Sequence, residues 1–544
     1  MTPGDELLFL ALGGSGEIGM NVNLYGCQGK WLMVDCGLTF SDPEFPGIDL
    51  ILPDLEFIER RRKDLVGLVL THGHEDHIGA IPYLAAELKV PIYATPFTAG
   101  LVAGKLEEEG LTGQVRLKIV ELGKALDLAP FKVSFVPLAH SIPEANGLII
   151  DTPHGRVFHT GDWKIDRTPV LAKPTSVEAM TRIGDEGVLA LVSDSTNAFA
   201  ETESGSEEDV VEGLLDTVGK ARGRVLVTTF ASNVARLDTI ARVAEESGRR
   251  VAVAGRSIER MLKVAKATGY LGDFPEPVRY DEAMRLPKNE LLIVATGGQG
   301  EPRAALGRIA VGNHELKLGD GDTVIFSSRQ IPGNEDAVGR VMNQLSDLGV
   351  ITVTDRQAHV HVSGHPGRPE LAEMYKWIRP KMLIPVHGEA RHLREQGRFG
   401  IANGIPLAIV QKNGDLIRLA PGKPKKLSEE RVGRLVLDGD VILPADGTTM
   451  NERRKLAFQG LISVGIALDK RGALLGEPSI RPVGVPVEAD RDDFIRDAVE
   501  SARRAIDPGL TEERLQENVR LAVRRVATLW TGKKPMVEVL VVRT

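Results

Sequence analysis

The chain has 544 residues, of which 42% are hydrophobic and 26% are charged, and its mean hydropathy is −0.08. This length predicts roughly two to four globular domains, and the composition excludes a disordered or fibrous protein. The formal net charge of −8 excludes the overall basic surface that many nucleic-acid-binding proteins carry. An RNA substrate would therefore have to be attracted by charge close to its binding site and not by the net charge of the whole chain.

The start of the chain carries no sign of a targeting or membrane segment. Residues 1–12 lack a basic region followed by a long apolar run, and no stretch reaches the roughly 20 apolar residues of a membrane span. Cys27 and Cys36 lack the spacing of a zinc site or a redox pair, so we expect two small buried side chains. We therefore expect a cytoplasmic protein without a membrane partner.

Short β-rich runs recur through the first half of the chain, with amphipathic segments between several of them, which predicts a layered α/β core. They are residues 7–12, 31–34, 66–70, 148–150, 189–192 and 225–227. Several runs end in polar residues: 66–70 leads to Thr71 and His72, 156–159 to Asp162, 189–192 to Asp194, and 382–386 to His387. Polar groups gathered at strand ends predict a site there.

The pattern changes twice along the remaining chain. Residues 205–348 predict a second α/β unit, which we interpret as an insertion because another histidine cluster follows it. The Pro- and Lys-rich stretch 421–426 predicts a linker, and two strand-like runs and a turn at Asp446 and Gly447 follow it. The last portion predicts helices at 494–506 and 512–530 and a strand at 536–542.

The strongest chemical signal is Thr71-His72-Gly73-His74-Glu75-Asp76-His77, directly after a predicted strand. Only 12 histidines occur in the chain, so three at this spacing are hard to explain by chance, and Gly73 allows a tight turn. Imidazole and carboxylate ligands suit zinc or manganese, and the absence of thiolates argues against a closed structural zinc site. The motif therefore predicts catalytic metal chemistry.

A site for two metal ions needs more ligands than this motif contains. The candidates are His140, in the stretch 139–143, and Asp162 and His387, which follow the predicted strands 156–159 and 382–386. A single histidine there is more often a hydrogen-bonded structural residue, so these candidates gain weight only from the first motif. Together they predict a binuclear centre.

A glycine motif, Gly14-Ser15-Gly16-Glu17-Ile18-Gly19, satisfies the GxGxxG pattern of a dinucleotide site, with Asp35 downstream. That motif must open a helix, whereas residues 20–25 alternate like a strand. We therefore predict a tight turn between strands.

At this point the chain resembles the metallo-β-lactamase nucleases with a β-CASP insertion, most closely the bacterial ribonuclease J family, over nearly its whole length. The matching segments are the histidine motif, Asp35 in 34–37, and residues 194–197, 230–233, 296–302, 331–335 and 361–365. The resemblance implies an αββα metallo-β-lactamase sandwich with an inserted β-CASP α/β domain and a small α+β C-terminal domain. The domains expected are 1–204 (metallo-β-lactamase, first part), 205–350 (β-CASP), 351–445 (returning part and linker) and 446–544 (C-terminal).

The resemblance also implies the roles of individual residues. One metal would be held by His72, His74 and His140, a second by Asp76, His77 and His387, and Asp162 would bridge them. Asp35 is expected to orient a ligand, Asp194 to orient a ligand or the nucleophile, and His365 to donate a proton to the phosphate or leaving oxygen. The implied phosphate-binding residues are Ser232, Asn233, His361, Val362, Ser363, Gly364 and His365. Without the resemblance, an ordinary turn would explain this serine, glycine and asparagine cluster.

The implied function is RNA hydrolysis by a two-metal phosphodiesterase, with 5′-monophosphate-dependent 5′-to-3′ exonuclease and endonuclease activity, in RNA decay and in rRNA and mRNA maturation. Zinc or manganese is expected, and magnesium can share such ligands. The expected partners are single-stranded RNA with a 5′ monophosphate, a second copy in a homodimer or tetramer, and RNA-decay proteins. The alternatives are a DNA nuclease, a hydrolase of small esters or thioesters, and an inactive RNA-binding scaffold. Gly298, Arg303 and Ala235 depart from residues common in the family, namely serine, methionine and histidine, and could shift substrate preference.

Overall fold

The structure, a computed structural model, describes residues 5–41, 44–331 and 333–544. Residues 1–4 of the first expected domain and Pro332 of the 331–335 motif lie outside these ranges. The chain forms two compact units. The first contains residues 5–39 and 52–432, and the second contains Phe40–Ile51 and Gly433–Thr544.

Two sheets form the centre of the first unit. The first has the order β23-β22-β1-β3-β4-β7-β8-β9, and the second has the order β10-β11-β12-β13-β14-β20. The strands of the first sheet are β1 (Leu7–Gly13), β3 (Val22–Cys27), β4 (Lys30–Val34), β7 (Leu65–Val69), β8 (Ile92–Ala94), β9 (Leu117–Ile119), β22 (Asp415–Ala420) and β23 (Lys425–Glu429). Those of the second are β10 (Leu126–Leu128), β11 (Phe131–Pro137), β12 (Asn146–Thr152), β13 (Gly155–His159), β14 (Ala190–Asp194) and β20 (Met382–Val386).

The two sheets pack face to face around one hydrophobic core. Phe9 and Tyr25 of the first sheet share this core with Phe131, Leu148 and Ile384 of the second. Strands β3 and β14 are buried at every position. A strand that is covered on both faces has mostly apolar side chains, because both of its faces lie in a core. The continuous apolar runs of the sequence are therefore explained by burial on both sides.

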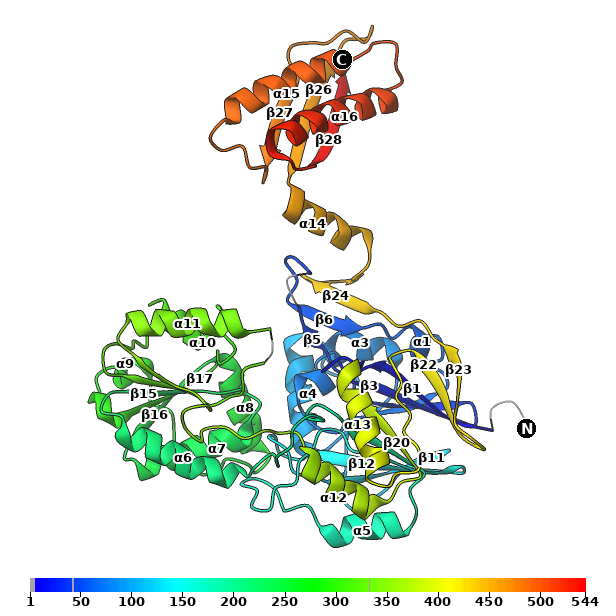
Figure 1. Ribbon diagram of the computed structural model, residues 1–544, viewed down its shortest axis with the longest axis vertical. Coiled ribbons are helices and arrows are strands. Elements are labelled where there is room, and N and C mark those ends of the chain that lie inside the picture. Colours follow the sequence, from blue (N-terminus) through cyan, green and yellow to red (C-terminus); the bar gives the residue numbers. More distant parts are fainter. Residues whose placement is uncertain (1–4, 42–43, 332) are drawn as a thin grey trace. The chain divides into compact units, whose positions relative to one another are not determined.

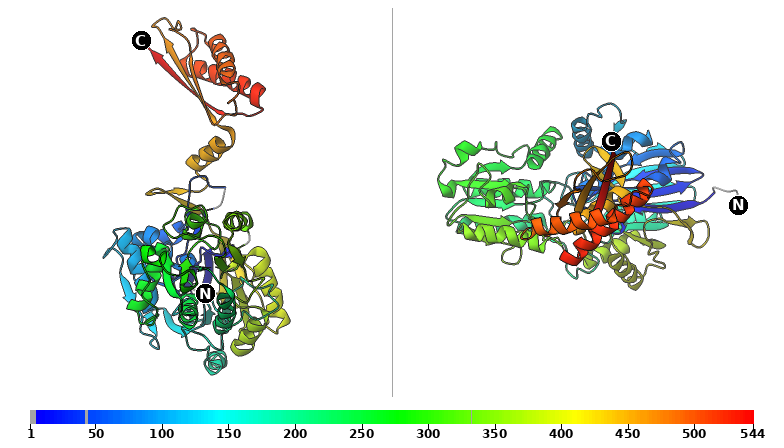
Figure 2. Two further views of the ribbon diagram at one scale, coloured as in Figure 1. Left: turned by 90° about the vertical axis from the view of Figure 1, so that its left-hand side faces the viewer. Right: turned by 90° about the horizontal axis from the view of Figure 1, so that it is seen from above.

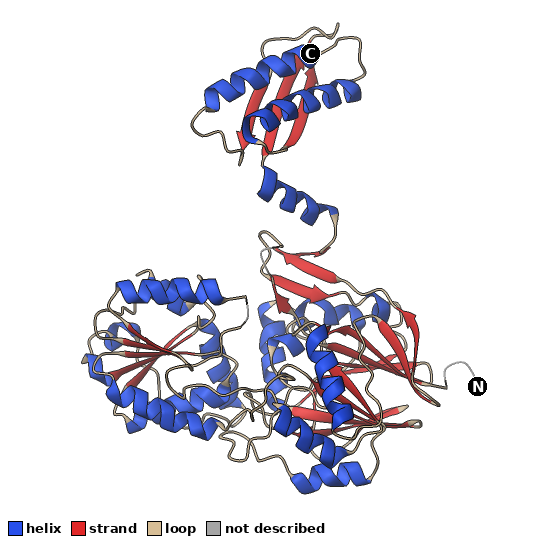
Figure 3. Cartoon of the chain, in the orientation of Figure 1, coloured by secondary structure: helices blue, strands red, loops and turns tan. Residues whose placement is uncertain are grey.

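Helices cover the outer faces of the sheets (Figure 3). On the second sheet, Met180 and Met374 pack against Phe158 and Leu191, and α13 contacts β20. These helices are α5 (Val177–Asp185), α12 (Arg368–Ile378) and α13 (Ala390–Ala402). Near the first sheet lie α1 (Glu56–Glu59), α3 (Ile81–Leu88) and α4 (Pro96–Glu108). The layers are helix, sheet, sheet and helix, which confirms the expected αββα architecture.

The inserted unit has its own parallel sheet, with the order β16-β17-β15-β18-β19. Its strands are β15 (Val225–Thr228), β16 (Arg250–Ala254), β17 (Leu291–Ala295), β18 (Thr323–Phe326) and β19 (Ile351–Val353). Its helices are α6 (Glu207–Lys220), α7 (Val234–Glu246), α8 (Arg256–Ala267), α9 (Tyr280–Ala283), α10 (Ala305–Ala310) and α11 (Glu335–Asp347). Helices α10 and α11 lie on one face of the sheet and α6 and α7 on the other (Figure 1), so the prediction of a second α/β unit is confirmed.

Two local predictions concern segments near the two ends of the first unit, and their outcomes differ. The linker predicted at 421–426 is partly wrong, because Lys425 and Lys426 belong to β23, which pairs antiparallel with β22. Lysine is common on exposed edge strands because it discourages pairing with other chains, so the composition marks a sheet edge. The glycine motif opens no helix, as predicted, but it is not a simple tight turn, because it contains the short strand β2 (Ser15–Gly16), which pairs parallel with β21 (Gly388–Glu389). Gly14 has a φ of +82°, and the chain leads into β3.

The second unit combines a segment from early in the chain with the C-terminal region. A four-stranded sheet has the order β25-β24-β6-β5, and a three-stranded sheet has the order β27-β26-β28. The elements are β5 (Thr39–Phe40), β6 (Leu50–Pro53), β24 (Arg434–Asp438), β25 (Val441–Pro444), α14 (Thr448–Gln459), β26 (Leu461–Leu468), β27 (Ser479–Val483), α15 (Arg491–Ala505), α16 (Glu512–Thr531) and β28 (Met536–Arg543).

Helices α15 and α16 pack on one face of the three-stranded sheet (Figure 2). Phe494 and Val519 of the helices share a core with Ile462 and Val464 of the sheet. The two helices and the final strand predicted from the sequence are confirmed. Across the described residues, no helix has both the length and the apolar character that a membrane span requires.

Candidate metal centre

The histidine motif folds as a loop followed by a single helical turn. Strand β7 ends at Val69, and His74 caps the N-terminus of α2 (Glu75–Ile78), which carries Asp76 and His77. Gly73 lies against Leu101, and a Cβ atom at this position would come within 2.6 Å of the leucine side chain. A larger residue here would have to displace the end of the Leu101 side chain.

The structure brings every predicted metal ligand into two adjoining groups. The first contains His72, His74, His140 and Asp162, and the second contains Asp76, His77, Asp162 and His387. Asp162 belongs to both, which is the arrangement expected of a bridging carboxylate. The ligands come from the ends of separate strands, as the sequence predicted.

The spacing of the facing atoms fits metal coordination. His74 Nδ1 lies 3.2 Å from His72 Nε2 and 3.1 Å from His140 Nε2, and His77 Nε2 lies 3.2 Å from Asp162 Oδ1. Ligands about 2.1 Å from a tetrahedral metal are separated from one another by about 3.4 Å. Asp162 Oδ1 is buried and accepts no hydrogen bond from the part of the chain that the structure describes. The donor atoms therefore surround positions that a cation would fill.

The protonation preferences of the site also favour cations. Burial holds the pKa of His72 and His140 well below the ordinary histidine value and lowers that of His74 to about 4, so these imidazoles keep a free lone pair. Burial opposes a charge on His387, but the carboxylates of Asp162 and Asp76 raise its pKa to about 9. Protons on the second group thus supply positive charge that a metal ion would replace, and metal binding would release them.

Buried partners fix the orientation of the ligand histidines. Asp35 accepts hydrogen bonds from Thr71 N and Thr71 Oγ1, each at 2.8 Å, and its Oδ2 lies 2.8 Å from His77 Nδ1. The Nδ1 contact leaves His77 Nε2 to face the metal position. Asp35 has a φ of +62°, a backbone conformation that aspartate and asparagine tolerate better than most residues.

Two further partners were missed by sequence reasoning. Thr196 Oγ1 lies 2.9 Å from His387 Nδ1, and the Gly364 carbonyl oxygen accepts a hydrogen bond of 2.6 Å from His140 Nδ1. Thr196 stands within the matching segment 194–197, but nothing in the sequence connects it with a histidine 191 positions away. Such partners orient the ligand rings and raise metal affinity.

A third polar group adjoins the metal positions and consists of Asp162, Asp194 and His365. Asp194 Oδ2 lies 2.7 Å from His365 Nδ1, and Asp194 Oδ1 accepts from Thr196 N at 2.8 Å. Burial opposes protonation of His365, but the Asp194 carboxylate raises its pKa above the ordinary value. This pair can present a proton donor beside the metal centre.

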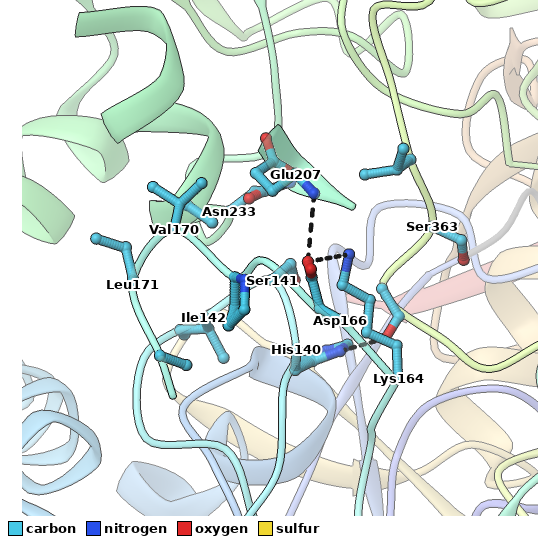
Figure 4. A pocket seen from close by; sticks show the side chains of 15 residues that line it. His140, Ser141, Ile142, Lys164, Asp166, Val170, Leu171, Glu207, Asn233 and Ser363 are labelled. Carbon is cyan, nitrogen blue, oxygen red and sulfur yellow. Dashed lines mark hydrogen bonds and ion pairs between the residues drawn. The ribbon is translucent and has the colours of Figure 1, made fainter. Parts of the chain in front are cut away.

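A cavity opens beside His140 (Figure 4). Four of the predicted phosphate-binding residues line it, namely Asn233, Val362, Ser363 and Gly364, whereas Ser232, His361 and His365 do not. Ser363 Oγ accepts from Asn197 Nδ2 at 2.8 Å and from His365 N at 3.2 Å, which leaves the hydroxyl proton available to a ligand.

The cavity also contains a cation that the sequence did not single out. Lys164 is buried and donates to the Gly205 carbonyl oxygen at 2.9 Å, and its Nζ lies 3.1 Å from Asp166 Oδ2. Asp166 also accepts from Ser206 Oγ and from Glu207 N, at the start of α6 (Figure 4). An ammonium has three donors, so one remains for a bound anion.

The fold and site together define a metallo-β-lactamase-type metallohydrolase with an inserted β-CASP domain. Its buried histidine and aspartate clusters are typical of a two-metal site in that superfamily. Four family models match the chain. They are "Metallo-beta-lactamase superfamily" (19–182), "Ribonuclease J, beta-CASP domain" (222–345), "Zn-dependent metallo-hydrolase RNA specificity domain" (351–400) and "Ribonuclease J C-terminal domain" (448–544).

Full-length relatives narrow the class to a family. A ribonuclease J of Sinorhizobium meliloti is 44% identical over 100% of this chain and 98% of its own, and one of Thermus thermophilus is 34% identical over 98% and 95%. The chain belongs to the ribonuclease J family. A solved structure of a protein of unknown function from Enterococcus faecalis V583 shares the fold, with a TM-score of 0.55, 19% identity and coverage of 76% of this chain and 100% of that one.

Proposed function

We propose that this chain hydrolyses RNA with two bound divalent metal ions, both by 5′-monophosphate-dependent 5′-to-3′ exonuclease action and by internal cleavage, in RNA decay and in rRNA and mRNA maturation. One observation carries the exonuclease proposal. The cavity wall formed by Ser363 and Gly364 is joined directly to the metal centre by the hydrogen bond between His140 Nδ1 and the Gly364 carbonyl oxygen. A terminal phosphate held there would place a nearby linkage at the metals.

The ligand sets that we propose are those predicted from the sequence. His72, His74 and His140 would hold one ion, and Asp76, His77 and His387 the other, with Asp162 between them. Zinc or manganese fits these nitrogen and oxygen donors, and magnesium can share them. Two such ions, when bound, supply a nucleophilic hydroxide at neutral pH and stabilise the negative charge of a phosphodiester under attack.

The Asp194–His365 pair would act on the scissile linkage. The carboxylate holds the imidazole in place through Nδ1, so Nε2 is free to donate a proton to the phosphate or to the leaving oxygen. Asp35 and Thr196 would keep His77 and His387 in the tautomer that metal binding needs. Hydrolysis would break the P–O bond as the leaving oxygen takes this proton.

The terminal phosphate would bind between Ser363, Gly364 and Asn233, with His361 and Ser232 supporting the wall. Lys164 would add an ammonium donor to the sequence-predicted hydroxyl and amide donors, although Asp166 offsets its charge. Ala235 also lines this cavity. A 5′ hydroxyl would forgo these contacts, which is the physical basis of the proposed preference.

RNA is favoured over the alternatives by the match to an RNA-specificity family model at 351–400. A small ester has little need of an inserted domain, and an inactive scaffold would not need a complete set of metal donors.

We propose the domain division 1–204, 205–350, 351–445 and 446–544. We also propose a cytoplasmic homodimer or tetramer that works with RNA-decay proteins. The outer position of Leu540 on β28, 68% exposed, supports self-association.

The test compares one RNA carrying a 5′ monophosphate, triphosphate or hydroxyl, with manganese or zinc supplied and matched single-stranded DNA as competitor. We expect mononucleotides chiefly from the monophosphorylated RNA. His77→Ala should abolish hydrolysis while RNA binding persists, and Ser363→Ala should reduce cleavage from monophosphorylated ends more than cleavage of circular RNA. Intact RNA in the presence of both metals would contradict the proposal.

A further inference from the structure

A fully buried ion pair lies in the inserted domain, outside the metal centre. Arg236 of α7 is 0% exposed and pairs through Nε and Nη2 with the carboxylate of Glu207 at the start of α6. Thr239 Oγ1 also donates to Glu207 Oε1, at 3.3 Å. A buried pair of this kind often adds little stability relative to a well-packed apolar pair of the same volume, so its presence calls for another explanation.

The remaining nitrogen of the arginine reaches the chain just before the proposed phosphate-binding segment 361–365. Arg236 Nη1 donates to the carbonyl oxygen of Val360 at 3.0 Å and to Ser327 Oγ at 2.6 Å. Ser327 Oγ in turn donates to the same Val360 oxygen at 2.7 Å. The guanidinium therefore binds Val360 directly and also sets the direction of the Ser327 hydroxyl.

The opposite end of the same segment is held by the metallo-β-lactamase core. Asn197 Nδ2 donates to the His365 carbonyl oxygen at 2.9 Å, and Asp194 contacts the His365 ring. Ser363 and Gly364 are also held on this side, through Asn197 Nδ2 and His140 Nδ1. The inserted domain fixes the segment before His361, and the core fixes it from Ser363 to His365.

From this geometry we infer that Arg236, held by Glu207, is a positioning residue that sets the distance between the terminal-phosphate cavity and the metal centre. Without the guanidinium, Val360 loses a charge-assisted bond and His361 and Val362 gain freedom, whereas Ser363 and His365 keep their contacts with Asn197. Arg236 therefore affects selection of the RNA end more than cleavage itself. The part of the inference that concerns RNA ends rests on the proposed function.

The variant for the test is Glu207→Met with Arg236→Met, which removes both charges together and leaves neither one buried alone. Glu207 also lines the terminal-phosphate cavity, so the positioning role is decided by a measurement on the 361–365 segment itself. The chain offers a matched control. Arg242 and Glu208 form a bidentate pair between the same two helices, at 2.8 and 2.9 Å, but both are partly exposed. The control variant is Glu208→Met with Arg242→Met. Arg236→Lys, with Glu207 intact, keeps the positive charge. This variant should retain part of the wild-type preference for monophosphorylated ends.

Two measurements separate the inference from the proposed function. Hydrogen–deuterium exchange of the peptide covering 359–366 needs no substrate, and we expect faster exchange in the first double variant and wild-type exchange in the control. On RNA, the ratio of kcat/KM for monophosphorylated over hydroxyl ends should fall about tenfold, chiefly through KM, with a smaller loss on circular RNA.

Each result bears on a separate claim. Unchanged exchange in the 359–366 peptide would overturn the positioning role, whatever the RNA results. Faster exchange together with an unchanged end ratio would overturn the effect on end selection. A wild-type enzyme without any preference for monophosphate would refute the proposed terminal pocket, while the exchange measurement would still decide whether Arg236 positions the segment.

Discussion

Asp35 offers a sharp test of how buried partners tune the metal centre, and Asp35→Asn is the substitution of choice. Asparagine tolerates the left-handed backbone at this position, where φ is +62°. Its carbonyl oxygen can still accept from Thr71 N, as Asp35 Oδ1 does. The amide group, however, replaces the oxygen that faces His77 Nδ1. The substitution therefore changes the contact with His77 and also the bond that the same oxygen accepts from Thr71 Oγ1, which an amide nitrogen could only donate to.

The expected loss follows from that contact. Without an acceptor at Nδ1, the His77 ring favours the tautomer that carries its proton on Nε2, the atom that must bind the metal. Loss of such an outer partner typically weakens metal binding by about 10- to 100-fold, or about 1.4 to 2.7 kcal/mol. We expect the larger loss at the position formed by Asp76, His77 and His387, and a smaller one at the other position, which Asp35 reaches only through Thr71 Oγ1 and His72.

The assay is a titration of metal-free protein with zinc or manganese against a chromophoric chelator, followed by RNA cleavage at rising metal concentration. Cleavage should recover at high metal. Asp322→Asn is the control, because Asp322 is equally buried and binds Arg224 N and Gly319 N rather than a ligand. Wild-type affinity in Asp35→Asn, or an equal loss in Asp322→Asn, would refute the reasoning.

Three further substitutions test other parts of the site. Thr196→Val should weaken metal binding about tenfold, because His387 Nδ1 loses its partner at 2.9 Å, whereas Thr196→Ser should not, as the same titration would show. Lys164→Met should reduce the preference for monophosphorylated over hydroxyl RNA by about 10- to 100-fold, as initial rates would show, and Lys164→Arg should retain part of it. Burial and the nearby Arg236, Arg329 and Lys164 charges lower the pKa of His361 to about 3. As pH falls below about 6.5, the unfolded chain therefore takes up a proton at His361 that the folded chain does not, and this difference destabilises the wild type. His361→Gln lacks this proton uptake. Between pH 7 and pH 5 its free energy of unfolding should therefore fall by about 2 kcal/mol less than that of the wild type.

The outcomes that would contradict these expectations are distinct. Equal metal affinity in the valine and serine variants of Thr196 would mean that the hydroxyl does not orient His387. A preserved end preference in Lys164→Met would remove the lysine from the phosphate cavity. An identical pH dependence of unfolding in His361→Gln and wild type would show that folding does not lower the pKa of His361.

The sequence by itself determined the chemistry of the centre. Three histidines and an aspartate within six positions after a strand define a metal site because the ligand types and the tight turn are local properties. Asp162 and His387 were found because each follows a predicted strand, and strands of one sheet bring their ends together. No strand was predicted before His140, which the structure places after β11. The strand runs themselves were readable because burial on both faces makes them continuously apolar.

Only the tertiary structure decided which polar residues support that chemistry. Thr196 meets His387, Lys164 enters the cavity, and Arg236 reaches Val360 across 124 positions of sequence. The lysines at 425–426 looked like a linker but form a sheet edge, because pairing with β22 depends on a strand from elsewhere in the fold. Each of these contacts joins residues with no local signal, since hydrogen bonds between distant segments depend on packing that no short stretch of sequence encodes.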